Sequence, residues 1–348
     1  MAHVRTTATL ASVADRAGVS LKTASNAING TGRMAEDTRA RVLAVVDELG
    51  YKVNVAARNL TRGRTDSVTL AVPTLKAAYL GDLAEAVVVT ARDLNLVVFV
   101  TTYPDGGYGA SRRFLQQFNA QSTDGLLLSL SEHESLDGSA LDVDYPLVCL
   151  GSRNTYGRAD RITTDDVADA RTATEYLLER GSRSVAVVGA HVPFDANVIA
   201  NADEGNAELR LRGVYEALTA SGRGLDPRLV GVTGYDWTIG SGFRAVRDLV
   251  DSGVPVDGLV CLNDGLAIGA ISALRERGVR VPEDVQVIGF DNVEESAFLT
   301  PPLTTMDSRI DWIARTALER LIMRIDGGTE PPAVLFGRSQ VVARDTTR

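Results

Sequence analysis

From residue 68 onward, short apolar runs alternate with helical stripes, and this alternation limits the possible folds more than any other feature. Two series of runs have the length of buried strands: 68–72, 96–100, 125–129 and 146–150, then 184–189, 229–232, 258–262 and 285–290. Helical stripes lie between them, for example Leu83/Val87/Leu94. Repeated alternation of strands and helices predicts two parallel α/β lobes. A last stripe, from Ile310 to Ile322, can cover one of them.

The size of the chain predicts two or three domains, since 348 residues exceed an ordinary single domain. No apolar run approaches the ~18–20 residues that span a bilayer. The first residues, MAHVRTTATL, lack the basic and apolar regions of a secretory signal. We therefore expect a cytoplasmic protein without a membrane partner.

Charge is distributed unevenly along the chain. The net charge is -9, yet residues 1–64 hold ten Lys and Arg against five acids, a balance of +5 that leaves -14 for the remainder. Phosphate attraction acts over about 8–10 Å, so local charge outweighs the total. A basic head on an acidic body is typical of a tethered DNA-binding domain, although small domains also vary in charge.

Three short helical patterns open the sequence. Their apolar stripes are Leu10/Val13/Ala14/Ala17, then Ala24/Ala27/Ile28, then Val42/Val45/Val46/Leu49. Thr9 and Ser20 are suitable N-caps for the first two helices. Gly18 provides a tight turn between them, and Gly50 ends the third helix. Two helices joined by a tight turn predict a helix-turn-helix motif whose second helix enters the major groove. The following connector, 51–67, is polar and basic.

Motifs for catalysis, cofactors and metals are scarce. None of the three lysines stands in a phosphate-binding glycine loop, and there is no dinucleotide-binding fingerprint or nucleophile elbow. The three histidines lack metal-ligand spacing. Cys149 and Cys261 lie inside apolar runs, which is typical of buried strand residues. We expect no cofactor and no metal, and a protein that binds rather than an enzyme.

Polar residues follow several predicted strands, where ligands of parallel α/β sheets bind. Asp291 follows the run 285–290, and Asn263 and Asp264 follow 258–262. Trp237 lies just past the run 229–232. The alternatives are a turn role for Asp291, helix capping for Asn263 and Asp264, and simple packing for Trp237.

With these residues in view, the chain resembles the lactose-repressor/galactose-repressor (LacI/GalR) family over essentially its whole length. The resemblance rests on TLASVADRAGVSLKTASNAING and TRARVLAVVDELGY near the amino end, NVAARNL in the connector, and RVPEDVQVIGFDNVEES with TPPLTTM near the carboxyl end. It implies a helix-turn-helix headpiece, a periplasmic-binding-protein-like core of two lobes, and a homodimer on palindromic operator DNA. The carboxyl terminus offers no heptad for a tetramer, so a dimer is expected.

The resemblance also implies domain boundaries. These are a headpiece at 1–52, a hinge helix and linker at 53–67, and a ligand-binding and dimerisation core at 68–348. Within the core we expect an amino lobe at about 68–164 and 292–306 and a carboxyl lobe at about 165–291 and 307–348.

In the headpiece, the resemblance places Leu21, Lys22 and Asn26 at base-reading positions. Lysine can donate to guanine and asparagine pairs with adenine. Where Asn26 and Ala24 stand, the family commonly has arginine and valine, which predicts a variant half-site. Short polar side chains are suited to phosphate contacts or capping: Thr9, Ser20, Thr23, Ser25 and Asn29.

In the connector, Leu60 matches the hinge leucine that inserts into the minor groove at the operator centre. Such a wedge would unstack a base step and bend the duplex. The alternative is packing of Leu60 against the body of the protein. Ala57 and Arg58 would line the same groove. Val53 stands where the family often has proline, so the rigidity of the hinge can differ.

In the core, the resemblance implies that Arg210, Trp237, Asn263 and Asp291 contact the effector. An arginine beside a carboxylate suits vicinal hydroxyls, and tryptophan suits the face of a pyranose. A sugar or sugar derivative is therefore expected. A purine site would stack the base between more aromatic side chains than are evident in this sequence. Tyr79 stands near the place of the family's asparagine-proline-aromatic motif. The segment 191–206 is long and polar, and is either a lid or plain surface.

The expected mechanism is a population shift, in which ligand changes the distance between the paired hinge helices and so the affinity for operator. One alternative is a cytoplasmic sugar-binding protein without a role in transcription, which the basic headpiece opposes. Another is an enzyme that uses Asp291 and Asp165 as an acid/base pair, for which the chain offers no nucleophile.

Overall fold

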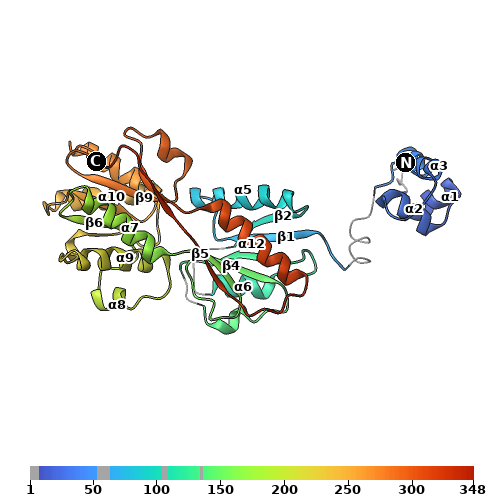
Figure 1. Cartoon of the computed structure of the whole chain (residues 1–348), viewed down its shortest axis with the longest axis horizontal. Coiled ribbons are helices and arrows are strands. Elements are labelled where there is room, and N and C mark those ends of the chain that lie inside the picture. The colour runs from blue at the N-terminus through green and yellow to red at the C-terminus, as the bar shows by residue number, and fades with distance from the viewer. Residues whose placement is uncertain (1–7, 53–62, 104–108, 134–135) are drawn as a thin grey trace, which may run out of the picture. The chain divides into compact units, whose positions relative to one another are not determined.

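The computed structural model describes residues 8–52, 63–103, 109–133 and 136–348. The chain divides into two compact units, Met1–Thr65 and Asp66–Arg348 (Figure 1). Among the described residues, no helix is long and apolar enough to cross a membrane. The predictions for Ala57, Arg58 and Leu60 lie outside the described residues.

The first unit contains the three predicted helices, α1 (Leu10–Ala17), α2 (Leu21–Asn29) and α3 (Glu36–Leu49). Thr9 and Ser20 cap α1 and α2, since their side chains accept from the backbone nitrogens of Ser12 and Thr23. Each helix ends at a glycine in the left-handed region, which a side chain would strain. The three predicted stripes supply the small core, namely Val13, Ala14, Ala17, Ala24, Ala27, Val42 and Val45, with Leu10, Ile28, Val46 and Leu49 packed against it.

The second unit contains two α/β lobes, each built on a sheet that has six strands among the described residues. In the amino lobe the strand order is β11-β5-β4-β3-β1-β2, all parallel. Its elements are β1 (Ser67–Val72), α5 (Ala78–Asp93), β2 (Val97–Thr102), α6 (Ala110–Gln117), β3 (Leu126–Ser129), β4 (Leu147–Leu150), β5 (Asp160–Thr164), α12 (Ile310–Ile325) and β11 (Val334–Gly337).

In the carboxyl lobe the strand order is β12-β10-β9-β8-β6-β7, parallel except for the pairing of β10 with β12. Its elements are α7 (Asp166–Glu179), β6 (Val185–Ala190), α8 (Ala196–Ala200), α9 (Asn206–Ala220), β7 (Val230–Val232), α10 (Ile239–Asp251), β8 (Gly258–Cys261), α11 (Asp264–Glu276), β9 (Gln286–Phe290), the 3-10 helix η3 (Glu294–Phe298), β10 (Thr304–Asp307) and β12 (Gln340–Val342). All eight predicted apolar runs are strands.

The division of the last sixty residues between the lobes differs from the prediction. We expected 292–306 in the amino lobe and 307–348 in the carboxyl lobe. Instead, β10 pairs with β9 in the carboxyl-lobe sheet, α12 packs on the amino-lobe core, and β11 pairs with β5. The chain therefore crosses between the lobes three times, after β5, β10 and β11 (Figure 1). Strand pairing over such separations leaves no local pattern in the sequence.

Helix α12 is fixed to the amino lobe by an ionic network as well as by its apolar stripe. Its Arg320 and Arg324 donate to the two carboxylate oxygens of the buried Asp160 at 2.6 and 2.7 Å. The backbone nitrogen of Ala333 donates to the same carboxylate at 2.9 Å. Although burial opposes ionisation, these hydrogen bonds hold the pKa of Asp160 below its ordinary value. One carboxylate thus joins β5, α12 and the segment that leads into β11.

The two cysteines are buried strand residues, as predicted. Cys149 lies in β4 of one sheet and Cys261 in β8 of the other, and both are free thiols. Burial raises the pKa of Cys149 to about 12, so it behaves as a small apolar side chain.

Candidate functional sites

The exposed face of α2 is the candidate surface for reading DNA bases. Leu21, with 54% of its surface exposed, and Lys22 lie in the first turn of the helix. Ser25, Asn26 and Asn29 follow one to two turns later, while Ala24 and Ala27 hold the opposite face in the core. Among the described residues, Leu21 belongs neither to the headpiece core nor to the side chains packed against it.

Several of the short polar side chains have partners within the headpiece. Ser20 accepts from the backbone of Thr23 and lies 2.9 Å from its hydroxyl, so both hydroxyls are part of the cap. Asn29 donates to the carbonyl of Ser25 at 2.9 Å. Asn26 accepts from Thr31 at 3.4 Å, a long bond that a base could replace.

Two of the headpiece arginines serve the fold. Arg16 of α1 forms an ion pair with Glu48 of α3, and Arg41 donates to the carbonyl of Ala17 at 3.1 Å. Both contacts tie α3 to α1. The balance of +5 already includes Glu48, so these contacts leave the net charge of the headpiece unchanged but hold two of its arginines against the fold.

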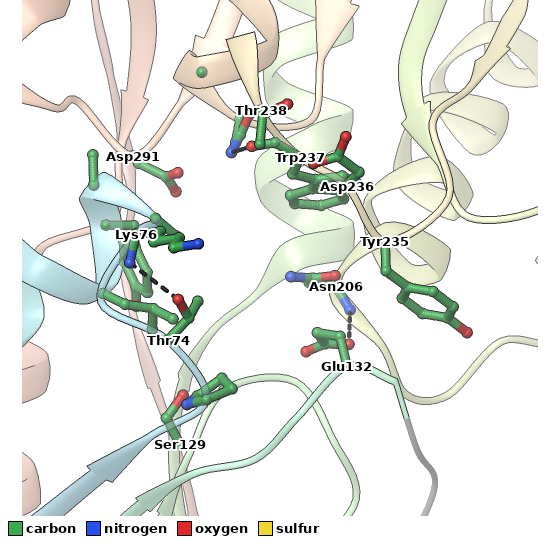
Figure 2. Close-up of a pocket in the computed structure, with 18 of the residues that line it drawn as sticks. Thr74, Lys76, Ser129, Glu132, Asn206, Tyr235, Asp236, Trp237, Thr238 and Asp291 are labelled. Carbon is green, nitrogen blue, oxygen red and sulfur yellow. Dashed lines mark hydrogen bonds between the residues drawn. The ribbon is translucent and has the colours of Figure 1, made fainter. Parts of the chain in front are cut away.

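The candidate ligand site is a cavity of about 880 Å³ between the two lobes. It is lined by the segments that follow the carboxyl ends of strands in both sheets, as expected for α/β proteins. Figure 2 shows Asp291 and Lys76 on one side of this space and Trp237, Asn206 and Glu132 on the other. All five predicted effector residues line it: Tyr79, Arg210, Trp237, Asn263 and Asp291.

A buried charge cluster forms one end of the cavity. Arg210 of α9 donates from Nε to Asp166 at 2.7 Å and from Nη1 to the carbonyl of Leu262, and Nη1 lies 4.0 Å from Asp291. Although burial opposes the charge, Asp166 and Asp291 raise the pKa of Arg210 above its ordinary value. Burial raises the pKa of Asp291 to about 6, although Arg210 opposes the rise. The guanidinium is thus oriented by protein partners before any ligand binds.

The backbone aims Asp291 into the cavity. Its φ of 102° is uncommon for a residue with a side chain, and Asn292 follows with a φ of 55°. The nitrogen of Asp291 donates to the carbonyl of Met306 at 2.9 Å, which holds this turn against β10. Strained backbone of this kind gathers at ligand sites.

Trp237 and Asn263 have both structural and site-facing roles. The indole nitrogen of Trp237 donates to the carbonyl of Gly189 at 2.8 Å, and its ring lies 5.9 Å from the Arg210 guanidinium. Asn263 caps α11 through Oδ1, which accepts from Leu266 at 2.7 Å. Capping was the alternative for Asn263, and it coexists with a place in the cavity lining.

Tyr79, in the first turn of α5, brings the amino lobe to the same cluster. Burial and the charge of Asp291 raise the pKa of its phenol, whereas Arg210 lowers it. Tyr79 lines the cavity from the amino lobe, and Arg210 and Asp291 line it from the carboxyl lobe.

Two acids that the sequence singled out have structural partners. Asp264 is buried and accepts from Val293, Ser296 and Thr305, which joins α11 to the segment around β10. Burial raises the pKa of Asp264 to about 7. Asp165 caps α7 by accepting from Ala168 at 3.1 Å. Among the described residues, no cluster of His, Cys, Asp and Glu could hold a metal ion.

The sequence prediction did not include a second group of lining residues: Lys76, Glu132, His133, His191, Asn206 and Tyr235. Glu132 and His191 come shortly after β3 and β6, so the strand-end rule that found Asp291 would have found them. The segment 191–206 proves to contact the other lobe. Gly205 donates to the carbonyl of Ser152 at 3.1 Å, and Glu204 accepts from the nitrogen of Asn154 at 2.9 Å.

Comparisons with known proteins agree with both units. A family model described as bacterial regulatory proteins, lacI family, matches residues 9–54, and a periplasmic binding protein-like domain matches residues 174–347. The HTH-type transcriptional regulator CelR of Thermobifida fusca is 32% identical over 97% of this chain and 98% of its own length.

Solved structures show the same similarity. The lac repressor dimer bound to operator and the anti-inducer ONPF has a TM-score of 0.84 at 25% identity, covering 98% of this chain and 99% of that one. The complex of the regulator CelR with cellobiose has a TM-score of 0.70 at 29% identity, covering 97% and 99%.

The helix-turn-helix unit and the two-lobed core with its cavity define a ligand-responsive DNA-binding regulator rather than an enzyme. More particularly, the chain belongs to the LacI family of bacterial regulatory proteins. It is a transcriptional regulator, which excludes the alternative of a binding protein without a role in transcription.

Proposed function

We propose that this regulator acts as a repressor in the cytoplasm, as a homodimer on palindromic operator DNA, and that a neutral sugar controls its affinity for the operator. Leu21, Lys22 and Asn26 read bases, while Thr9, Ser20, Thr23, Ser25 and Asn29 contact phosphates or support α2. The exposed face of α2 and the resemblance of its residues to the family pattern support this assignment.

The dimer contact proposed here includes the edge of the amino-lobe sheet. Strand β2 is the last strand of that sheet, and Val97 and Phe99 expose 57% and 54% of their surface. Two large exposed apolar side chains on an edge strand mark an interaction surface, since native proteins protect such edges. A two-fold dimer would present two headpieces to two half-sites. Ala57, Arg58 and Leu60 of the connector are proposed to contact the minor groove between them.

Electrostatics favours a ligand without negative charge. Among the described lining residues, five carry carboxylates (Glu132, Asp166, Asp236, Asp291 and Glu295) and two carry permanent cations (Lys76 and Arg210). Arg210 is already bonded to Asp166 and lies near Asp291. A phosphate would therefore meet carboxylates with one free lysine to offset them, whereas neutral hydroxyls can donate to the carboxylates.

The observation that carries the ligand assignment is convergence. Tyr79, Arg210, Trp237, Asn263 and Asp291 are far apart in the sequence, and all five line one cavity between lobes that the chain crosses three times. A ligand that touches both lobes has different affinity for open and closed arrangements. It can therefore shift operator affinity, typically by ~1–3 kcal/mol.

Thermal unfolding of the full chain tests the ligand class. Wild type, Asp291→Asn and the exposed control Asp311→Asn are compared over neutral sugars, sugar phosphates and nucleosides. A ligand at 100 times its Kd adds about 2.7 kcal/mol of stability. We expect a neutral sugar to stabilise wild type and Asp311→Asn but not Asp291→Asn. Stabilisation by a phosphate ester or nucleoside alone would show that the sugar assignment is wrong.

Selection of operator sites from random duplex DNA tests the regulatory part separately. The full chain should enrich a palindrome, and its affinity should fall steeply with salt because phosphate contacts release counterions. Addition of the stabilising sugar should change that affinity. A chain that binds sugar and enriches no sequence would contradict the proposed function.

A further inference from the structure

The segment 191–206 is anchored to the carboxyl lobe over most of its length. Ile199 of α8 is buried in the core of that lobe, and Phe194 packs against the same core. Further along, the carbonyl of Ala202 accepts a hydrogen bond of 3.0 Å from Arg212 of α9. These contacts fix the segment as far as Ala202, so the residues that follow extend from a firm support.

The residues that follow Ala202 reach the amino lobe and contact the turn after β4. The backbone nitrogen of Gly205 donates to the carbonyl of Ser152 at 3.1 Å. The carboxylate of Glu204 accepts from the backbone nitrogen of Asn154 at 2.9 Å, and it lies 3.7 Å from the guanidinium of Arg153. Two hydrogen bonds and one ion pair therefore join residues 152–154 of one lobe to two residues of the other.

Arg153 is held in place by its own lobe before it meets Glu204. Its guanidinium forms an ion pair with Glu132 at 3.1 Å and donates to the Glu132 carbonyl. The side chains of Arg153 and Glu204 are only 11% and 16% exposed, so water screens their ion pair less than it screens a surface pair. Neither of these two residues is among the described residues that line the cavity.

The contacted turn lies next to the first crossing between the lobes. Arg161 of β5 donates to the carbonyl of Arg153 at 3.0 Å, and β5 leads directly into that crossing. Lobes that are joined by a few strands can rotate about them. A noncovalent contact beside those strands restrains the rotation, because the lobes cannot turn freely while Glu204 and Gly205 stay bound.

We propose that Glu204 and Gly205 form a clasp on residues 152–154, a fourth connection between the lobes that adds to the three crossings of the chain. The clasp biases the core toward the lobe arrangement described here, independently of ligand. Its loss lets the lobes populate other arrangements. The regulatory consequence rests on the proposed function: operator affinity follows the populations of the lobe arrangements, so it changes when the clasp is broken.

Distances between spin labels in the full chain test the clasp without ligand or DNA. The labels are attached through Glu175→Cys in α7 and Glu319→Cys in α12, two exposed positions on different lobes. The native cysteines are buried. An excess of unlabelled chain removes distances between subunits. Glu204→Ala should shift or broaden the distance distribution by about 2 Å or more, the size of a domain rearrangement.

Asp203→Ala is the matched control, because Asp203 is an exposed acid next to Glu204. This variant should keep the distances of the wild type. Glu204→Gln keeps an acceptor for Asn154 but loses the charge that faces Arg153, so its effect should be smaller than that of Glu204→Ala. Unchanged distances in Glu204→Ala would overturn the clasp.

Operator affinity tests the regulatory consequence separately. Without ligand, Glu204→Ala should bind the palindrome selected by the wild type with an affinity changed about fivefold or more, and Asp203→Ala should stay within about twofold. Altered distances with unchanged operator affinity would keep the clasp and overturn its role in regulation. If the wild type selects no palindrome, the proposed function is wrong, and the label distances still decide the clasp.

Discussion

The side-chain nitrogen of Asn263 donates a hydrogen bond of 3.2 Å to the backbone carbonyl of Trp237. The same amide caps α11 through its oxygen. One side chain therefore fixes the start of a helix that follows β8 and the position of an aromatic ring that follows β7. The cavity wall depends on this link, since Trp237 lines the cavity.

Replacement of Asn263 by serine or alanine should separate these two roles. Serine keeps a capping oxygen but loses the donor to Trp237, so Asn263→Ser should cost about 1 kcal/mol of unfolding free energy. Asn263→Ala also loses the cap and should cost about 1 kcal/mol more. Both should weaken ligand binding to a similar extent, about tenfold. Denaturant unfolding and calorimetry measure these effects, and equal stability of the two variants would contradict the capping role.

Lys22→Ala should reduce operator affinity by about 1–3 kcal/mol and relax preference at one position of each half-site, because a base contact is lost. Lys52→Ala removes an exposed lysine outside α2. It should weaken all sequences equally, if it has any effect. Competition between the selected operator and single-base variants distinguishes the two results. A uniform loss for Lys22→Ala would assign this lysine to phosphate.

Replacement of a helical glycine by alanine should have opposite effects on stability in α11 and in α5. A Cβ at Gly269 of α11 would clash with the backbone carbonyl of Ile239 in α10. Gly269→Ala should therefore destabilise the core by about 1–3 kcal/mol. Gly81 of α5 has open space for a Cβ, so Gly81→Ala should raise stability by about 0.5–1 kcal/mol. Thermal unfolding of both variants is the measurement, and destabilisation by Gly81→Ala would contradict the described surface.

The raised pKa of the buried Glu132 should make the stability of the protein depend on pH. Burial raises its pKa to about 7 from an ordinary value near 4.5, so the folded state binds its proton more tightly than the unfolded state. Its contribution to stability is present below pH 4.5 and is lost as the pH rises to 7. Glu132→Gln lacks this titration. The stability of wild type relative to this variant should therefore fall between pH 4.5 and 7, and parallel curves would contradict the assignment.

Phe99→Glu should weaken the dimer, because a carboxylate would enter the proposed contact at β2. Val232→Glu provides the control, since Val232 is also exposed but lies on the carboxyl-lobe edge strand β7. Sedimentation at several concentrations should show dissociation for Phe99→Glu only, with a parallel loss of operator affinity. A dimer unaffected by Phe99→Glu would place the contact elsewhere.

Much of this fold could be predicted because its strands are apolar on both faces. The run 258–262, for example, is buried throughout β8. The strands that were missed are polar or short. In β10, Thr304 and Thr305 are fully buried, and their hydroxyls bond Arg344, Thr347 and Asp264. The threonines of β10 can be buried because residues about forty positions away satisfy their hydroxyl groups. The composition of the segment alone therefore does not predict a buried strand.

The candidate site divides in the same way. Arg210, Asn263 and Asp291 stand in recognisable patterns, and the resemblance to a family identified them. Asn206 begins α9 at the end of the long polar segment 191–206, and Tyr235 lies after β7; their place in the cavity depends on how the two lobes meet. The arrangement of the two lobes cannot be predicted from the local sequence around these residues.

The three crossings also govern the order in which the protein can be completed during synthesis. The amino lobe begins at β1, yet its sheet lacks an edge strand and its core lacks a covering helix until α12 and β11 have been made. The carboxyl lobe is finished later still, when β12 pairs with β10. Both halves of the core therefore close only after α12, β11 and β12 have been made, and a chain that stops short of these elements would expose apolar surface in both lobes at once.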